Sequence, residues 1–188
     1  MTFEAYLTIF ESILKSANPP APYDVPDYFN YAKLNWSRMS RWSKVAVPSE
    51  EIVHTMEGIV KPQLWIVITE PWCGDAAHII PFINIIAALN PLVTVDYQLR
   101  DAEPHLIAGY LTNGGKSIPK LIIRDENGVD LSNWGPRPLK SQALYNQLKA
   151  QEADFDTMKS ELQKWYNADK GVEIQQELNR LISLHVSL

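Results

Sequence analysis

The sequence predicts an α/β protein, a three-layer α/β/α sandwich with a mixed central sheet and additional helices at both ends of the chain. Three observations point to this class. The continuous apolar run from Leu64 to Thr69 has the length of a strand that is buried on both faces. Segments with helical spacing alternate with further short apolar runs. An Asn-Gly pair between two such runs predicts a hairpin, so parallel and antiparallel pairing must coexist in one sheet.

The first 61 residues are expected to form an N-terminal helical extension. Apolar residues at helical spacing predict a first helix from about Phe3 to Leu14, which ends before Asn18-Pro19-Pro20. A proline-rich connector follows. Asp27 is expected to cap a second helix that runs to about Lys44.

The second helix carries basic residues at every third position, namely Arg38, Arg41 and Lys44. This spacing favours either a docking face for an acidic partner or a solvated face whose aromatic neighbours turn to the core. Ser49, followed by Glu50 and Glu51, predicts the start of a third helix, because a side-chain oxygen and first-turn acids suit the unpaired amides there.

Residues 62–150 are expected to form the central domain. Alternating apolar runs and helical patterns predict strands over 64–69, 92–99, 120–124 and 129–132, with helices over about 73–89 and 102–111. From Leu139 the chain is mostly helical. Residues 151–188 are expected to form a C-terminal helical extension that packs on the same domain and is interrupted near Gly171.

Composition narrows the function classes. The 188 residues carry a formal net charge of −5, which gives no electrostatic reason to expect nucleic acid as a partner. No apolar run approaches the roughly 20 residues needed to cross a bilayer, so no membrane partner is expected. The N-terminal segment lacks the basic region and cleavage pattern of a signal peptide, so a cytoplasmic protein is expected.

The single cysteine lies in the stretch Glu70-Pro71-Trp72-Cys73-Gly74-Asp75-Ala76, between a predicted strand and a predicted helix. One cysteine cannot form an intrachain disulfide. At the first turn of a helix, unpaired N–H groups and the helix dipole favour thiolate over thiol, so we expect a nucleophilic sulfur. Asp75 opposes this effect electrostatically, while Trp72 can shield one side of the site.

This segment resembles the thioredoxin family. Trp72 to Ala76 stands where that family has W-C-G-x-C, and Pro81 stands where its active-site helix carries a kinking proline. The stretch from Gly114 to Ile123 resembles the family's cis-proline loop and the strand after it. The resemblance covers roughly 62–150 and implies a thioredoxin-like domain there.

Later motifs extend the likeness. Gly135 falls where a family glycine borders the substrate groove. The chain also resembles a branch of thioredoxin-like proteins that carry E-x-W-C-G-D, N-G-G-x-S-I-P-K and W-G-P-R-P together. The resemblance implies a groove around Cys73, to which we assign as candidate substrate-binding residues Trp72, Gly74, Asp75, Ile118, Pro119, Gly135 and Arg137.

The resemblance implies a chemical role for Cys73 as the thiolate that attacks a substrate disulfide. Ala76 occupies the place of the resolving cysteine, and Val67 stands at the buried acid of many thioredoxins. We therefore expect monothiol exchange or redox sensing with a disulfide-containing protein, completed by glutathione or another small thiol. The alternative is a non-catalytic module whose groove binds a peptide.

Two residues leave alternatives open. If the peptide bond before Pro119 is cis, the preceding backbone can pair with an extended substrate; otherwise Pro119 simply begins an edge strand. Arg137 either lies near the thiolate or grips a substrate carboxylate, or it forms a salt bridge with Glu70 or Asp75.

The histidines show no metal-binding pattern, so no bound metal or cofactor is expected in the monomer. His78 is expected to be exposed, because five residues of helix turn it roughly 140° away from Cys73. Two thiols meeting across a homodimer, with added glutathione, could hold an iron–sulfur cluster. The extensions have three alternative roles: they brace the sheet, build a dimer or close the groove.

Overall fold

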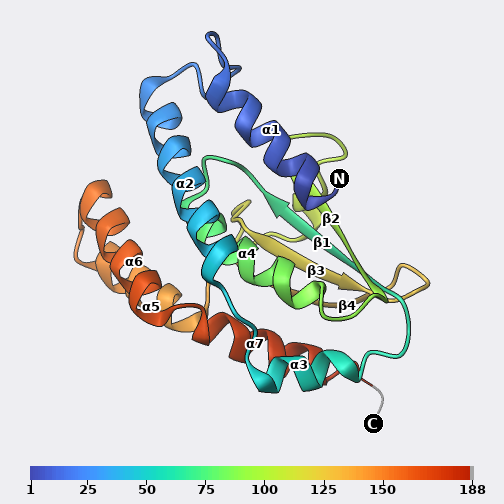
Figure 1. Cartoon of the computed structure of the whole chain (residues 1–188). Helices are drawn as coiled ribbons and strands as arrows, with labels where there is room; N and C mark the ends of the chain where they lie inside the picture. The colour runs from blue at the N-terminus through green and yellow to red at the C-terminus, as the bar shows by residue number, and fades with distance from the viewer. Residues whose placement is uncertain (187–188) are drawn as a thin grey trace.

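A four-stranded mixed sheet forms the centre of the computed structural model, which describes residues 1–186 (Figure 1). The strands are β1 (Gln63–Thr69), β2 (Val93–Leu99), β3 (Lys120–Arg124) and β4 (Asp130–Trp134). The helices are α1 (Phe3–Lys15), α2 (Pro26–Val45), α3 (Glu50–Glu57), α4 (Gly74–Ala87), the 3-10 helix η1 (Leu106–Gly109), α5 (Leu139–Ala150), α6 (Phe155–Asp169) and α7 (Val172–Ser183).

The order of the strands across the sheet is β2-β1-β3-β4. β1 pairs with β2 in parallel through the crossover helix α4, and β1 pairs with β3 antiparallel. β3 and β4 form the hairpin that the Asn-Gly turn predicted. The predicted α/β fold, with a mixed sheet and extra helices, is confirmed.

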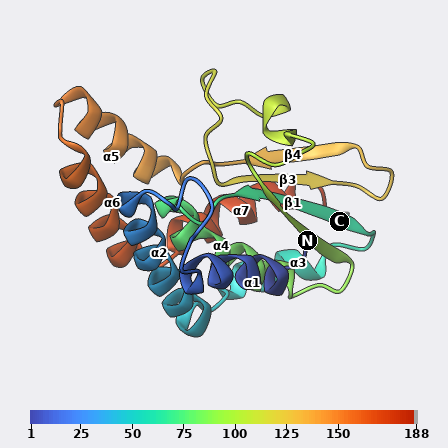
Figure 2. The same cartoon turned by 90° about the horizontal axis from the view of Figure 1, so that it is seen from above.

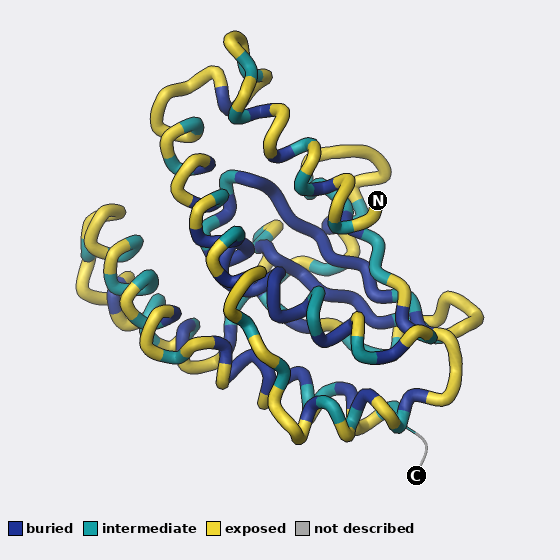
Figure 3. The backbone as a smooth tube through the Cα atoms, viewed as in Figure 1, coloured by how far each residue is buried: buried dark blue, intermediate teal, exposed yellow. Residues whose placement is uncertain are grey.

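One face of the sheet carries most of the helical mass. Tyr97 of β2 shows how two helices meet there, because its ring stacks on Tyr6 of α1 at 5.9 Å and its hydroxyl donates to Asn84 of α4 at 3.2 Å. Trp134 of β4 donates to Glu177 of α7 at 2.7 Å, which docks the last helix on the same face. Figure 3 shows β1, β3 and most of α4 as buried.

The other face of the sheet has little helical cover. The prediction of a helix over 102–111 is wrong. That segment forms only the single 3-10 turn η1, which Figure 2 shows on the opposite side of the sheet from α1 and α4. Pro104 lies within the expected helix, where the missing N–H and the ring oppose helical bonding. Ile107 is fully buried all the same, so one turn covers this face.

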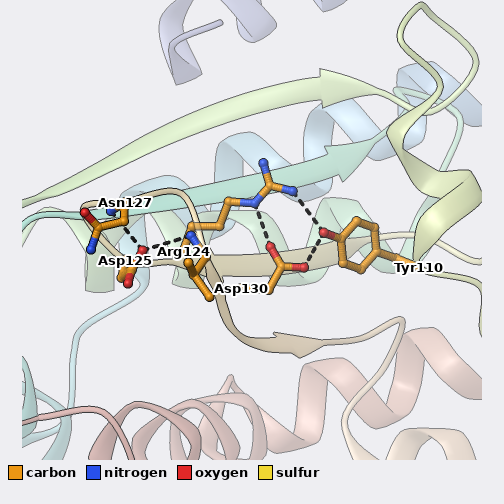
Figure 4. A network of polar contacts seen from close by, with 6 residues as sticks. Tyr110, Arg124, Asp125, Asn127 and Asp130 are labelled. Carbon is orange, nitrogen blue, oxygen red and sulfur yellow. Dashed lines mark hydrogen bonds and ion pairs between the residues drawn. The ribbon is translucent and has the colours of Figure 1, made fainter.

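A polar network ties the η1 segment to the β3–β4 hairpin (Figure 4). Arg124 donates to Asp130 at 2.7 Å and to the Tyr110 hydroxyl at 3.0 Å, and that hydroxyl donates to Asp130. Asp125 closes the turn by accepting from the backbone of Asn127 at 2.9 Å. The loop that continues from Tyr110 to β3 is thereby held at its start.

Three of the added helices, α2, α5 and α6, lie near the end of the sheet where β1 runs into α4 (Figure 1). α2 packs along α4, and α5 and α6 lie side by side beyond it (Figure 1). Side chains cap α1, α3 and α6 at Thr2, Ser49 and Asp154. The expected cap at Asp27 is wrong, because α2 begins at Pro26 with Val25 at the cap position, so the Asp27 carboxylate lies in the first turn.

Candidate functional site

Cys73 lies at the start of α4, in the turn between β1 and this helix. Its N–H donates to the Glu70 carbonyl at 3.0 Å, and its sulfur accepts from the Ala76 N–H at 3.5 Å as the helix cap. The thiol in turn donates to the Ile118 carbonyl at 3.4 Å. The side chain is only 6% exposed. The sulfur is therefore held as a thiol between two backbone groups.

The expected low pKa of this thiol is wrong. Burial and, next, the Asp75 carboxylate raise the pKa of Cys73 to about 12. The Ala76 N–H and the Arg137 charge act in the opposite direction but are outweighed. The free energy lost when a thiolate is removed from water is larger than the stabilisation by one amide N–H and the helix dipole. A position at the start of a helix is therefore not enough to predict a low cysteine pKa.

Ile118, Pro119 and Gly135 meet beside the thiol. The Ile118–Pro119 and Gly135–Pro136 peptide bonds are both cis. Gly135 has a φ of +112°, and a Cβ there would collide with the Pro119 carbonyl oxygen. The buried Lys120 ammonium joins the two loops by donating to Thr112 at 2.8 Å and to the Gly135 carbonyl at 3.1 Å. Only glycine fits this close approach of two chain segments.

Asp75 lies at the wall of the cleft, between the loop that precedes α5 and helix α6. Arg137 forms a 2.6 Å ion pair with one carboxylate oxygen, and the Tyr166 hydroxyl donates to the other at 2.8 Å. Arg137 thus forms the salt bridge to Asp75 that was one of its alternatives, and its charge also acts on the Cys73 thiol. The side chains of Arg137 and Asp75 are both largely buried, so each charge is balanced mainly by the other and only slightly by solvent.

His78 is buried, and the expectation of an exposed histidine is wrong. The Trp42 indole donates to its Nδ1 at 2.9 Å, and its ring stacks on Tyr166 at 4.4 Å. Burial, followed by the charge of Arg38, lowers the pKa of His78 to about 3. The helical turn does direct the ring away from Cys73, but towards α2 and α6 rather than water.

Aromatic residues from α2 border the thiol turn. The Trp72 ring contacts Tyr28 edge-on at 6.4 Å and lies under the Arg100 guanidinium at 4.6 Å. The Tyr31 hydroxyl packs so closely against Gly74 that a Cβ at that position would overlap it. Trp134, by contrast, docks α7 and does not form the rim.

These residues line a cleft of about 1250 Å³ between α2, the 112–118 loop and the α5–α6 pair. Of the predicted site residues, the cleft brings together Trp72, Cys73, Gly74, Asp75, Ile118 and Arg137, with Pro119 and Gly135 directly behind them. The N-terminal and C-terminal extensions supply two of its walls.

Sequence reasoning missed Tyr31, Arg38 and Tyr166, which line the cleft from outside residues 62–150. The three-residue repeat of bases on α2 did single out Arg38, but as part of an exposed face. It is 7% exposed and turns inward. No signal in the sequence indicated the contact of Tyr166 with Asp75.

Within residues 1–186, no three side chains of the types that bind metals gather into a candidate metal site. No helix in the same part of the chain is long and apolar enough to cross a membrane.

Comparison with known proteins agrees with this architecture. A protein-family model described as thioredoxin matches residues 23–154, which is more than half of the chain. No curated protein sequence matches.

Solved structures give more distant likenesses. An HIV epitope scaffold is 14% identical with a TM-score of 0.53, covering 94% of this chain and 96% of its own. A protein of unknown function from Pseudomonas aeruginosa is 15% identical with a TM-score of 0.48, covering 92% and 99%. A mutant of the alkylhydroperoxide reductase component AhpF from Enterococcus faecalis is 18% identical with a TM-score of 0.39, covering 51% and 47%.

Proposed function

Because the chain belongs to the thioredoxin family, we propose that it is a binding protein on a thioredoxin fold, whose cleft holds a ligand beside Ile118 and Pro119. The observation that carries this proposal is the state of the Cys73 thiol. It is buried, it donates to a carbonyl, and its pKa is raised to about 12. Such a thiol is a poor nucleophile at neutral pH.

The dimensions of the cleft favour an extended peptide as the ligand. Its volume of about 1250 Å³ exceeds the roughly 300–1,000 Å³ typical of small-molecule pockets. The backbone before Pro119 borders the cleft, where an extended chain can pair with it as an added strand. Trp72 and Tyr28 offer apolar contact area at one rim.

Monothiol exchange is the second candidate, favoured because the Cys73 sulfur borders the cleft and accepts from the Ala76 N–H. In that reaction the thiolate attacks one sulfur of a disulfide-containing protein and expels the other as a thiolate. With alanine at position 76, a second thiol such as glutathione must release the mixed disulfide. In either case we expect the protein to act in the cytoplasm, where thiols stay reduced.

Turnover separates the two candidates. We would measure glutathione-dependent reduction of hydroxyethyl disulfide by the wild-type protein and by Cys73→Ser. The binding proposal predicts that both stay at the uncatalysed rate. A rate well above background in the wild type, lost in Cys73→Ser, would replace it with monothiol exchange.

Binding is tested with peptides selected from a displayed random hexapeptide library. Ser117→Trp would place an indole in the cleft, and Ser37→Trp provides the matched control because Ser37 is exposed on α2 and is not among the cleft residues. We expect the selected peptides to lose at least tenfold in affinity for Ser117→Trp only. Equal affinity for both variants would show that the cleft is not the binding site.

A further inference from the structure

Arg38 is an unusually placed cation. It is 7% exposed, although arginine is rarely buried without an ionic partner. One guanidinium nitrogen, Nη1, donates to Asn35 at 2.9 Å, while Nε is buried without a hydrogen-bond partner. No carboxylate among residues 1–186 forms an ion pair with it. A buried charge left in this state is costly unless something else balances it.

The surroundings hold this guanidinium in a fixed orientation. Asn35 is fully buried, and its amide donates to the Pro71 carbonyl at 3.1 Å in the turn that precedes Cys73. The Tyr31 ring lies 5.4 Å from the guanidinium carbon, and the Tyr31 hydroxyl packs on Gly74. Arg38 is thus tied to the thiol turn from two sides and lines the cleft.

The charge of the cleft differs in sign from that of the chain. Its lining includes six cationic side chains, Arg38, Arg100, Lys116, Arg137, Lys149 and Lys159, and three acidic ones, Asp27, Asp75 and Asp156. The lining therefore carries three more cationic than acidic side chains, and because Arg100 is paired with Asp101 just outside the lining, about two positive charges remain in excess in a protein of net charge −5. A second cation, Lys159, lies 5.5 Å from the same Tyr31 ring. Such a concave surface attracts anions.

We propose that Arg38 binds an oxyanion, a carboxylate or a phosphate group, of the ligand that occupies the cleft. The guanidinium fork is suited to both groups, and its partial burial makes each hydrogen bond stronger than in water. The inference rests on the proposed function in that both use one cleft. It adds the chemistry of the ligand and assigns its recognition to the N-terminal extension.

The direct test is a titration monitored at the Arg38 Nε–H signal in ¹⁵N NMR spectra of the wild-type protein. Sodium succinate and sodium phosphate are the two probes, and sodium chloride at equal ionic strength is the control. We expect a saturable shift with at least one probe and no saturation with chloride. The stronger probe identifies the group as carboxylate or phosphate. No saturation with either probe would overturn the proposal.

Variants show whether Arg38 itself binds the probe. Arg38→Lys keeps the charge but loses the fork, and we expect at least tenfold weaker binding by calorimetry. Arg41→Lys is the matched control, because Arg41 lies one turn further on α2 and is not among the cleft residues; its affinity should stay within twofold. Equal affinities of the wild type and Arg38→Lys would refute the assignment.

A second variant guards against misfolding of Arg38→Lys. Asn35→Asp places a carboxylate against Arg38, so it should compete with the added oxyanion and weaken binding at least tenfold. Unchanged binding in a folded Asn35→Asp would contradict the proposal.

The peptides selected above separate this inference from the proposed function. If they bind in the cleft with equal affinity for wild type and Arg38→Lys, the oxyanion inference fails and the binding function stands. If succinate or phosphate binds at Arg38 but no peptide is recovered, the peptide function fails and the oxyanion site stands.

Discussion

The buried ion pair between Asp75 and Arg137 leads to a quantitative prediction. Asp75→Asn removes the charge that pairs with Arg137 at 2.6 Å but leaves an oxygen that can accept from Tyr166. Breaking a buried ion pair by removing one partner costs about 3–5 kcal/mol. Arg137 is 17% exposed and keeps contacts with Gln142 and Tyr145, so we expect the lower end, about 3 kcal/mol.

The assay is urea denaturation followed by tryptophan fluorescence, with a double-mutant cycle that adds Arg137→Met. We expect the two single substitutions to destabilise the fold by about 3 kcal/mol each and the double variant by less than their sum, with a coupling energy of about 2 kcal/mol. A loss below about 1 kcal/mol for Asp75→Asn, or additive losses, would refute the inference that this ion pair anchors the loop before α5 to α4.

Three further predictions concern the thiol, the loops behind it and the buried histidine. With a pKa of about 12, roughly one Cys73 thiol in 10⁵ is ionised at pH 7, against about one in 30 for an ordinary thiol. Iodoacetamide should therefore react with Cys73 about 10³-fold more slowly than with a free thiol. A rate within tenfold of that of a free thiol would contradict the burial argument. Gly135→Ala should cost at least about 2 kcal/mol in urea unfolding, because the methyl group meets the Pro119 carbonyl at a positive φ; an unchanged midpoint would show that the loops relax freely. His78 has a folded-state pKa near 3, below its unfolded value of about 6.5, so its contribution to stability is intact above pH 6.5 and is lost as the pH falls, by about 2 kcal/mol at pH 5. The drop between pH 7 and pH 5 should shrink in His78→Gln but persist in a variant of the exposed His54, and equal drops in all three proteins would exclude His78 as the cause.

The sheet was predictable because its signals are local. The strand from Lys120 to Arg124 has the predicted bounds, since an apolar run between a proline and an Asn-Gly turn leaves little choice of register. The segment 102–111 misled because its apolar spacing is helical, although Pro104 and Gly109 both oppose a helix. The single turn η1 buries Ile107 against the sheet, so a helix is not required to cover this face.

The site was predictable in position but not in chemistry. The W-C-G-D segment, the Ile118–Pro119 pair and Gly135 were placed together correctly in the fold. The pKa of Cys73 was not foreseen, because it depends on burial by distant parts of the chain. The partner of Asp75, Tyr166, is likewise 91 positions away, and sequence patterns carry no information on such contacts.

The carboxylate of Asp75 has both oxygens occupied, one from residue 137 and one from residue 166. A protein that ends at position 150 would lose Tyr166 and keep Arg137, so the Asp75 carboxylate would be more exposed and bound on one side only. The shortened protein would thus differ from the 188-residue protein at Asp75, within the W-C-G-D motif on which the resemblance to the thioredoxin family rests. A shortened scaffold made from this sequence should therefore retain α6, whatever chemistry is later introduced beside the thiol.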